Sequence, residues 1–406
     1  MSTVVTDRKT VDEVINSFAR TTDEVFTLDG LRRLLLSGRQ LRMKYGVDVT
    51  APSMHIGHAV NLWMYRKLQE LGHKLVFLIG DFTTQIGDPT GKNKTRPIIP
   101  IEEIEKNSKA FIEQAKMVVH DNPDLIEVRK NSEWFESMPT KRFIGLLQMV
   151  THDRLISRDM FRKRIEGKQE IYMHELVYPV IQGYDSVALE ADIAIIGSDQ
   201  LYNEMLGRLY QEKFGQFSQV ILTTKITPGI DGKEKQSKSL NNYVGLGHTP
   251  REKFGRIMSM PDSQIVEYLE VYTDVVDEEI DLAKHDVDIN PMKWKLFLAA
   301  EIVARYHGRE AAQDELKWFK ETFSQGKVPD EIDTIIIGAN SLDSFSILRK
   351  CLSESEFSNS EIRRLFAQGA IKFDGLAIND IKQVVDVSEY GVIIKVGKRK
   401  WFKAIP

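Results

Sequence analysis

Two histidines three positions apart, His55 and His58, stand where an extended segment gives way to a helical one. Residues 41–49 place apolar side chains at every second position, as a half-buried strand does, and apolar residues recur at helical spacing through 59–71. A helix therefore begins near His55, and the unpaired N–H groups and positive dipole end of a helix start attract phosphate. Gly57 leaves room for a flat ligand against the backbone. The pattern predicts a nucleotide site.

A second group of charged side chains lies in residues 232–240. Lys235 and Lys238 are separated by two polar residues and preceded by Gly229 and Gly232. Two ammonium groups on a mobile loop could close over a triphosphate and neutralise the charge that develops on a leaving pyrophosphate. Such lysine pairs are also common on solvated loops, so a functional role depends on the pairing of this loop with the histidine motif.

A third group lies in the middle of the chain. Tyr178, Gln182 and Asp185 recur at roughly helical spacing, which places them on one side of a helix. The apolar residues 179–181 favour a buried segment over the alternative, a polar helix surface. A buried carboxylate needs a hydrogen-bond donor, and the hydroxyl of a ligand would provide one.

Composition narrows the class of protein. The chain has 406 residues, of which 42% are hydrophobic and 28% charged, as expected for a soluble globular protein of several domains. The net charge of −4 does not by itself indicate a nucleic-acid partner. Cys351 is the only cysteine, which excludes an internal disulfide and a cysteine-based metal cluster. The N-terminal segment lacks the apolar core of a signal peptide and no run is long enough to span a membrane, so we expect a cytoplasmic protein.

The elements that must position these residues alternate between strands and helices, which predicts an α/β fold with a parallel sheet and helices on both faces. Ligands in such sheets bind outside the carboxyl ends of the strands. Strands are expected at 41–49, 74–80, 125–129, 191–197 and 219–224. Helices are expected at 11–20, 27–36, 101–119, 140–157, 173–183 and 199–212, with a polar loop at 81–97 and a basic connector at 158–164.

The pattern changes after residue 245. Amphipathic helices without a clear strand are expected at 252–260, 263–272, 277–283, 291–307 and 309–323, followed by a linker at 325–341. Residues 342–406 combine a helical part ending at 369 with short strands at 370–375 and 391–396. This segment carries 11 basic and 8 acidic side chains, so its net charge is +3 against −7 for the rest of the chain. A small basic segment on an acidic body is either a nucleic-acid contact or a solvated surface.

The motifs resemble those of a known family. His55-Ile-Gly-His58 resembles the HIGH signature of class I aminoacyl-tRNA synthetases, and Lys235-Gln-Ser-Lys-Ser239 is similar to their KMSKS loop with glutamine in place of methionine. The segment from Tyr178 to Asp185, together with Gly197-Ser-Asp-Gln200, resembles the tyrosine pocket of bacterial tyrosyl-tRNA synthetases of the branch that has a KMSKS-like loop.

The resemblance covers nearly the whole chain and implies its domains. It implies a Rossmann-like catalytic domain over 1–245, with an insertion at about 125–172 through which members of the family form homodimers. An α-helical anticodon-binding domain would follow over 246–335. The segment 342–406 is similar to a small α+β RNA-binding domain that also occurs in a ribosomal small-subunit protein. Its implied RNA contacts are Arg363, Arg364 and Lys372.

The resemblance also implies roles for residues in the amino-acid pocket. Asp185 would receive the phenolic hydroxyl of L-tyrosine, and Gln200 would lie near the carboxyl end of the substrate. The substrate ammonium would be held by Tyr178, Gln182 and Asp88. Lys44 departs from one branch of the family, which has there a tyrosine that also bonds the substrate hydroxyl.

For ATP, the resemblance implies contacts along both motifs. The adenosine would be lined by Gly46, Asp48 and Gly57, with Asp199 at the ribose and His58 close by. The phosphates would be contacted by Thr50, His55, Lys92, Arg96, Lys235, Ser237, Lys238 and Ser239. Lys92 and Arg96 could instead be ordinary exposed loop charges. Mg²⁺ is expected as the counterion of ATP, and the sequence indicates no dedicated metal site.

The implied function is a two-step ligase reaction, in which tyrosine and ATP form tyrosyl-adenylate and the tyrosyl group then passes to the 3′ end of tRNA(Tyr). Three alternatives remain open. Tryptophan could be the substrate, although an indole would not require Asp185. A cytidylyltransferase shares a histidine motif of this kind but explains neither the pocket segment nor the C-terminal half. A paralogue could keep the fold and bind RNA structurally or serve another acceptor.

Overall fold

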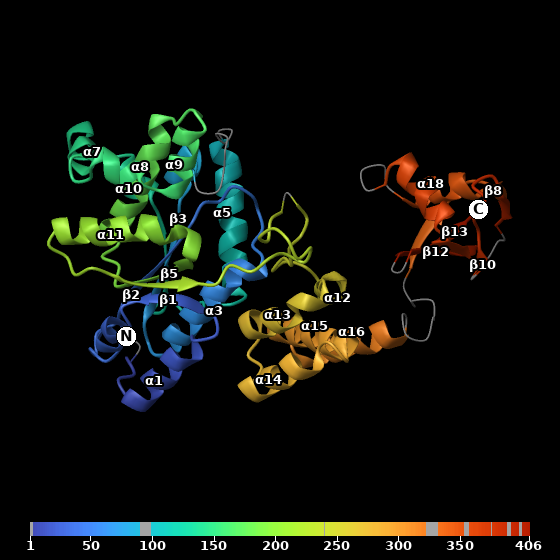
Figure 1. The fold of residues 1–406 in the computed structure, drawn as a ribbon, viewed down its shortest axis with the longest axis horizontal. Helices are drawn as coiled ribbons and strands as arrows, with labels where there is room; N and C mark the ends of the chain where they lie inside the picture. The colour runs from blue at the N-terminus through green and yellow to red at the C-terminus, as the bar shows by residue number, and fades with distance from the viewer. Residues whose placement is uncertain are drawn as a thin grey trace. The chain divides into compact units, whose positions relative to one another are not determined.

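The computed structural model describes residues 3–89, 99–238, 240–321, 332–352, 357–374, 376–387, 391–397 and 400–406. The chain divides into two compact units, Met1–Ala312 and Gln313–Pro406, called here the first and the second unit (Figure 1). Each unit has its own core, and the two are described separately.

A six-stranded sheet forms the centre of the first unit, in the order β1-β6-β5-β2-β3-β4. All neighbours are parallel except β1, which runs antiparallel to β6 at one edge. The five strands predicted from the apolar runs are confirmed, whereas β1 was not predicted. Its sequence Thr-Asp-Glu-Val-Phe is polar, and its side chains are exposed or half-buried, as an edge position allows. The strands are β1 Thr22–Phe26, β2 Arg42–Val47, β3 Lys74–Ile79, β4 Ile126–Lys130, β5 Ile193–Gly197 and β6 Val220–Thr224.

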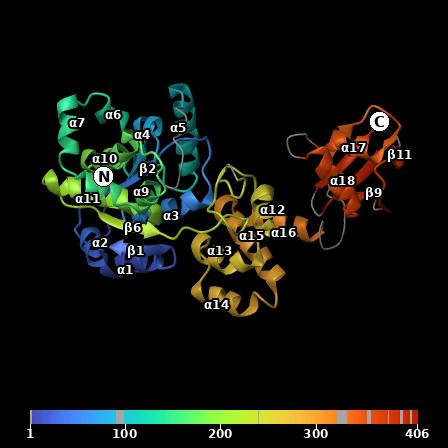
Figure 2. The ribbon, with the colours of Figure 1, turned by 45° about the horizontal axis from the view of Figure 1, so that its top comes forward.

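Helices cover both faces of this sheet (Figure 1). Alternate side chains of β3 show this directly, because Leu75, Phe77 and Ile79 join a core cluster with helices α1, α2, α3 and α5, whereas Val76 and Leu78 pack with Leu189 at the end of α10. On the α10 side, α10 and α11 lie side by side (Figure 2). These helices are α1 Arg8–Ser17, α2 Leu28–Leu35, α3 Ile56–Glu70, α5 Ile101–Lys116, α10 Met173–Ala188 and α11 Leu201–Lys213, the last preceded by the 3₁₀ turn η1 Ser198–Gln200.

Three expectations in this part of the chain were wrong in detail. The predicted basic connector is helix α9, Asp159–Glu166, because Arg164 turns inward and forms a buried two-pronged ion pair with Glu175, at 2.7 and 3.0 Å. The predicted helix at 140–157 is two helices, α7 Thr140–Leu147 and α8 His152–Ile156, because the side chain of Thr151 caps α8 by accepting from the Arg154 N–H.

The third difference concerns the predicted polar loop at 81–97. It begins with a short helix, α4 Asp81–Ile86, and the adjoining helix α6, Ser132–Phe135, follows β4. The Asp81 carboxylate joins the two, because it accepts hydrogen bonds from the N–H and hydroxyl of Ser132, at 3.0 and 2.7 Å. Residues 90–98 lie outside the described part of the chain.

The rest of the first unit is helical, as predicted. It packs against α3: the indole of Trp63 donates to the Tyr306 hydroxyl at 3.3 Å, and the Arg305 guanidinium lies 4.4 Å from the centre of the indole ring system. The helices are α12 Pro250–Ser259, α13 Ile265–Tyr272, α14 Asp277–Asp286 and α15 Pro291–His307, with η2 Asp262–Gln264 before α13. Helix α16, Arg309–Phe319, spans the division between the units. Among the described residues, no helix has the length and apolar character to cross a membrane.

The second unit is a small α+β fold with its own core (Figure 2). The predicted linker was wrong in its second half: β7, Asp333–Ile336, pairs in parallel with β13, Lys400–Ile405, and Ile337 is buried in the core. Neither strand was predicted, because β7 is short and exposed and β13 reads as a basic tail. The main sheet has the order β10-β9-β12-β13-β7, with β9 Ile371–Phe373, β10 Leu376–Ala377 and β12 Val392–Val396. The remaining elements are α17 Ser344–Cys351, α18 Asn359–Ala367 and the pair β8 Ser341–Asp343 and β11 Val384–Asp386.

Candidate functional site

A cavity of about 420 Å³ opens at the carboxyl ends of β2, β3 and β5 in the first unit. Most of the described residues that were predicted for the site line it. They are Gly46, Asp48, Thr50, His55, Gly57, His58, Asp88, Tyr178, Gln182, Asp185, Asp199, Gln200 and Lys235. The structure therefore gathers residues from distant segments of the chain around one space.

The histidine motif occupies the start of α3. His55 is the N-cap residue, and its Nδ1 accepts a hydrogen bond from the Gly57 N–H at 3.2 Å. The Nδ1 of His58 accepts in turn from the His55 N–H at 3.2 Å, and the two rings are 3.9 Å apart. In a neutral imidazole whose Nδ1 accepts, Nε2 carries the proton, so both rings can donate from Nε2. A Cβ at position 57 would lie 2.9 Å from the His55 Nδ1, which explains the glycine.

The charge state of this pair follows from its surroundings. Burial lowers the pKa of His55 well below its ordinary value, and the neighbouring His58 and Lys238 lower it further. Burial likewise lowers the pKa of His58 to about 4, with Lys238 adding to the effect. Both imidazoles are therefore neutral near pH 7 and act as hydrogen-bond donors rather than as cations.

The lysine loop follows β6 and lies beside the same cavity. The Lys235 ammonium is 3.0 Å from the Asp199 carboxylate, and both side chains are partly exposed. Lys238 lies over the Phe111 ring at 5.4 Å, and its burial lowers the pKa of its ammonium to about 8. Lys238 and Ser237 do not line the cavity itself, and Ser239, Lys92 and Arg96 lie outside the described residues.

Asn242 holds this loop in shape. Its side-chain oxygen accepts from the Ser237 N–H at 2.7 Å, and its amide donates to the Asp231 carboxylate at 2.9 Å and to the carbonyls of Glu234 and Lys235. The glycines upstream had indicated a mobile loop, yet these bonds give the described part of it a defined conformation.

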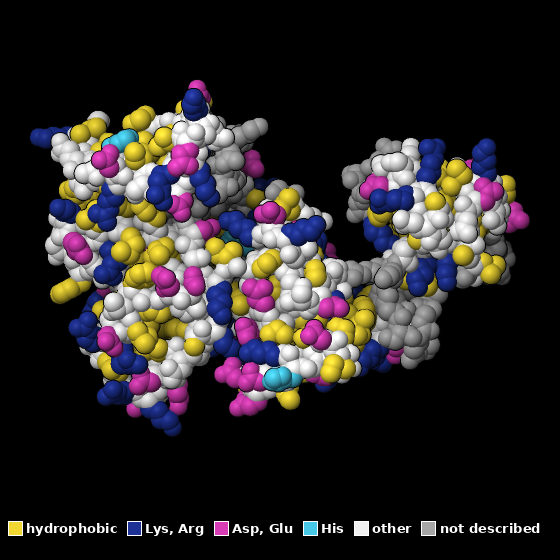
Figure 3. Space-filling model, viewed as in Figure 1, with side chains coloured by type: hydrophobic (Ala, Val, Ile, Leu, Met, Phe, Trp, Pro, Cys, Tyr) yellow, Lys and Arg dark blue, Asp and Glu magenta, His cyan; other side chains and the backbone are white. Residues whose placement is uncertain are grey.

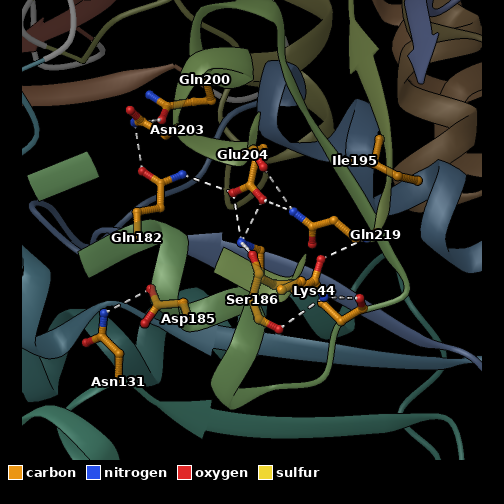
Figure 4. A network of polar contacts seen from close by, with 12 residues as sticks. Lys44, Asn131, Gln182, Asp185, Ser186, Ile195, Gln200, Asn203, Glu204 and Gln219 are labelled. Atoms are coloured by element: carbon orange, nitrogen blue, oxygen red, sulfur yellow. Dashed lines mark hydrogen bonds and ion pairs between the residues drawn. The ribbon is translucent and has the colours of Figure 1, made fainter. Parts of the chain in front are cut away.

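At the other end of the cavity, polar side chains form a continuous hydrogen-bonded network (Figure 4). The Gln200 amide donates to Asp88 at 2.9 Å, and the Asn203 amide donates to Gln200 and to Gln182, at 2.9 and 2.8 Å. Gln182 then donates to Glu204 at 3.0 Å. Asp88, Gln200 and Gln182 are thus joined, the last two through Asn203, and Gln182 contacts Glu204. The sequence analysis missed both Asn203 and Glu204. Their position one turn beyond Gln200, on α11, could have indicated them.

Lys44 and Glu204 form a buried ion pair under this network (Figure 4). Their side chains are 3% and 2% exposed, and the Nζ–Oε2 distance is 2.7 Å. Lys44 also donates to the Ser186 hydroxyl at 2.7 Å, and Gln219 donates to Glu204 at 2.7 Å. The described partners of the Lys44 ammonium are therefore protein groups.

Asp185 is buried at the floor of the cavity. Its carboxylate accepts from the Trp134 indole at 3.0 Å and from the Asn131 amide at 3.4 Å. Burial raises the pKa of Asp185 to about 8, and the charge of Lys44 and the two donors oppose that rise. Asn131 and Trp134 were not predicted, although they directly follow β4, at the sheet edge where ligands bind.

Asp48 connects the two ends of the cavity. Its carboxylate accepts from the Tyr178 hydroxyl at 2.9 Å and from the Thr83 hydroxyl at 2.8 Å. Burial and the charges of Asp48 and Asp88 raise the pKa of Tyr178 well above its ordinary value, so its hydroxyl stays protonated and donates. A side chain expected at the adenosine therefore also orients one expected at the amino acid.

The second unit holds the remaining candidates, and the structure does not gather them on one face. Arg363 and Arg364 are exposed on α18. Lys372 lies between Ile371 and Phe373, which are buried in the core shared with α18, so its side chain points to the opposite face of the sheet. On the face shown in Figure 3, acidic and basic side chains are interspersed.

Within the described residues, no group of three histidine, cysteine, aspartate or glutamate side chains could hold a metal ion. The fold and the cavity therefore define an α/β protein with a cavity at the carboxyl ends of its parallel strands, which is lined by neutral imidazoles and a lysine on one side and by a buried carboxyl group on the other.

The comparisons with known proteins narrow this class. The model of the family "tRNA synthetases class I (W and Y)" matches residues 36–324. The chain is 38% identical over 399 residues to tyrosine–tRNA ligase 2 of Photorhabdus laumondii, covering 98% of this chain and 99% of the relative. It is 41% identical over 384 residues to the tyrosine–tRNA ligase of Carboxydothermus hydrogenoformans, covering 93% of each.

Solved structures agree on the fold. A C-terminally truncated mitochondrial tyrosyl-tRNA synthetase of Aspergillus nidulans matches with a TM-score of 0.63 and 20% identity, over 78% of this chain and 97% of that one. The Archaeoglobus fulgidus tyrosyl-tRNA synthetase complexed with L-tyrosine matches with a TM-score of 0.59 and 21% identity, over 75% of this chain and 99% of that one. The chain belongs to the class I tRNA synthetases of the tryptophan and tyrosine group.

Proposed function

We propose that the protein is a tyrosine–tRNA ligase, which activates L-tyrosine with ATP and transfers the tyrosyl group to the 3′ end of tRNA(Tyr). The observation that carries the proposal is the buried Asp185 carboxylate at the floor of the cavity that also holds His55 and Lys235. Nearly full-length similarity to proteins named tyrosine–tRNA ligase supports it.

Tyrosine selection rests on Asp185 in this proposal. The phenolic hydroxyl bonds to the carboxylate, which Trp134 and Asn131 already hold in place. Phenylalanine lacks the hydroxyl and leaves this buried group without its ligand partner, which costs about 1–3 kcal/mol or more for a charged group. The substrate ammonium lies among Asp88, Tyr178 and Gln182, and Gln200 lies near the substrate carboxyl end.

In the activation step, a carboxylate oxygen of tyrosine attacks the α-phosphorus of ATP in line. The new P–O bond forms as the bond to pyrophosphate breaks. None of the proposed residues acts as a covalent nucleophile, so the protein contributes positioning and charge stabilisation. His55 and Thr50 donate to the phosphates, while Lys235 and Lys238 neutralise the leaving pyrophosphate.

ATP binds along the start of α3 in this proposal. Its adenosine lies on the backbone at Gly46 and Gly57, near Asp48 and His58, with the ribose at Asp199. Ser237, Ser239, Lys92 and Arg96 contribute further phosphate contacts. Mg²⁺ arrives with the triphosphate as part of the substrate.

The acceptor RNA and the quaternary structure belong to the same proposal. The helices after residue 245 bind the anticodon arm, and Arg363, Arg364 and Lys372 contact RNA from the small C-terminal domain. We also propose a cytoplasmic homodimer formed through the 125–172 insertion. Exposed apolar side chains on this insertion and the start of α10 support that role: Val128, Ile144, Ile165, Tyr172 and Met173.

The first test is pyrophosphate exchange with tyrosine or tryptophan as the amino acid. Exchange with tyrosine but not with tryptophan would support the proposal. Exchange with tryptophan instead would make tryptophan the substrate. Aminoacylation of purified tRNA(Tyr) is the second test, because activation without transfer would indicate a paralogue that serves another acceptor.

A further inference from the structure

Gln236, the residue that departs from the family's loop pattern, is 7% exposed and takes part in two hydrogen bonds. Its amide donates to the Tyr272 hydroxyl at 2.8 Å, and its oxygen accepts from the Val244 N–H at 3.3 Å. A methionine could make neither bond. The glutamine therefore ties the middle of the lysine loop to a residue outside the Rossmann-like domain.

Tyr272 stands at the end of α13, in the helical part of the first unit. Its buried hydroxyl also bonds to the Thr227 hydroxyl, at the start of the loop. Tyr268, one turn earlier on α13, donates to the Pro228 carbonyl at 2.7 Å. Two tyrosine hydroxyls on one helix face thus hold the entry and the middle of the loop. We call Tyr268, Tyr272 and Gln236 the loop clasp.

The loop clasp also connects to the histidine motif. The Val244 N–H that donates to Gln236 belongs to a residue whose carbonyl accepts from the Ile56 N–H at 2.9 Å. Ile56 is the first residue of α3. A short path of hydrogen bonds therefore joins α13, the lysine loop and the helix start that faces the ATP phosphates. Tyr272 and Gln236 both line the cavity.

We propose that Tyr272 and Gln236 are positioning residues that hold Lys235 and Lys238 in the arrangement required for pyrophosphate departure. This inference rests on the proposed function, because it assumes that the loop acts on ATP. A loop that these bonds hold in a defined conformation needs less ordering during the reaction. The helical part of the unit thereby contributes to the ATP site through a tyrosine that the sequence motifs did not indicate.

The test compares Gln236→Met, Tyr272→Phe and the double variant by tyrosine-dependent pyrophosphate exchange. Each single variant leaves a buried polar group without its partner and should lower kcat/KM for ATP about tenfold. The double variant should lose less than the product of the two single losses, because the two side chains share one bond, which can be removed only once. KM for tyrosine should stay within about twofold, because the tyrosine pocket is not touched.

Tyr210→Phe is the matched control. The Tyr210 hydroxyl is buried and donates to the Leu146 carbonyl at 2.8 Å, away from the loop. It should leave kcat/KM for ATP within about twofold, because it removes a comparable hydrogen bond without a loop contact. Any of four results would overturn the proposal. They are single variants with unchanged kcat/KM for ATP, a double variant whose loss equals the product of the two single losses, a rise in KM for tyrosine as large as the loss in kcat/KM for ATP, and an equal loss of kcat/KM for ATP in Tyr210→Phe.

Limited trypsin digestion tests the loop clasp independently of the proposed function. The loop offers cleavage after Lys233, Lys235 and Lys238. Gln236→Met and Tyr272→Phe should be cut there faster than the unaltered protein, whereas Tyr210→Phe should not. If the protein lacks tyrosine-dependent exchange but its variants show this cleavage pattern, the proposed function is refuted while the loop clasp is supported. Equal cleavage rates would refute the clasp.

Discussion

Two lysine–carboxylate pairs line the same cavity, Lys44–Glu204 at one end and Lys235–Asp199 at the other. Their N–O distances are similar, 2.7 and 3.0 Å. Their exposures differ: 3% and 2% for the first pair, against 59% and 32% for the second. The first pair also has Ser186 and Gln219 as partners, whereas in the second pair Lys235 lies on a loop and Asp199 lies in the 3₁₀ turn η1.

The difference in exposure suits the two pairs to different parts of the proposed reaction: the buried pair to selection of the amino acid and the exposed pair to catalysis. A buried pair with several hydrogen-bond partners is held in one geometry, and Glu204 accepts a hydrogen bond from Gln182, which lies beside the tyrosine pocket in the proposal. An exposed pair costs little to break. When the ribose of ATP takes the Asp199 carboxylate, Lys235 becomes available for the phosphates. In the proposed reaction, the rigid end of the cavity would select the amino acid, and the loop at the other end would change its contacts when ATP binds.

Breaking the buried pair should have the largest effect. Lys44→Met leaves Glu204 charged and buried, which should lower the free energy of unfolding by about 3–5 kcal/mol. Lys235→Met, at the exposed pair, should change it by less than about 1 kcal/mol. Urea unfolding followed by tryptophan fluorescence measures both, and equal losses would contradict the comparison.

Removing the half-buried loop cation should affect chemistry rather than folding. Lys238→Ala should slow adenylate formation about 100- to 1000-fold, because charge on the leaving pyrophosphate loses a partner. Tyrosine affinity should remain, since Asp185 and its donors are untouched. Pre-steady-state pyrophosphate release measures the rate, with the exposed Lys233→Ala as the control on the same loop. An unchanged rate would remove Lys238 from the mechanism.

Replacing the proposed acceptor of the substrate hydroxyl should reduce activity less than removing the charge of Lys238. Asp185→Asn should lower kcat/KM for tyrosine about 5- to 150-fold, which corresponds to the ~1–3 kcal/mol cost of leaving a buried polar group without a matching partner. Phenylalanine should gain relative to tyrosine, because the buried carboxyl group that it would leave without a partner is gone. Exchange kinetics with both amino acids measure the ratio. A ratio equal to that of the unaltered protein would place the hydroxyl elsewhere.

The smallest effect should come from pH. Burial lowers the pKa of Lys238 to about 8, so its charge is present below that pH and is lost as pH rises through it. Between about pH 7 and about pH 9, kcat/KM for ATP should therefore fall about tenfold. Lys238→Arg keeps its charge over this range and should not show the fall. A similar decline in this variant would assign the titration to another group.

The sequence predicted the parts of the fold that depend on local pattern. The five parallel strands were recognisable because both their faces are buried and their apolar runs are short and bounded by glycine or polar residues. The edge strands β1 and β7 were missed, because exposed strands carry polar side chains and depend on a partner for their conformation. Strand β13 is partly buried, but its lysines made it read as a basic tail. Arg164 was taken for a surface charge because its partner, Glu175, lies on the following helix.

The sequence by itself determined the chemical groups of the site. Histidines at a helix start, a lysine loop and a carboxylate among apolar residues are local patterns with local physical consequences. Only the tertiary structure decided how those groups are held. The bond from Tyr272 to Gln236, the donors Asn131 and Trp134 on Asp185, and the pairing of Lys44 with Glu204 join residues far apart in the chain. Side-chain pairing across such distances depends on packing geometry, which residue types and spacing do not specify.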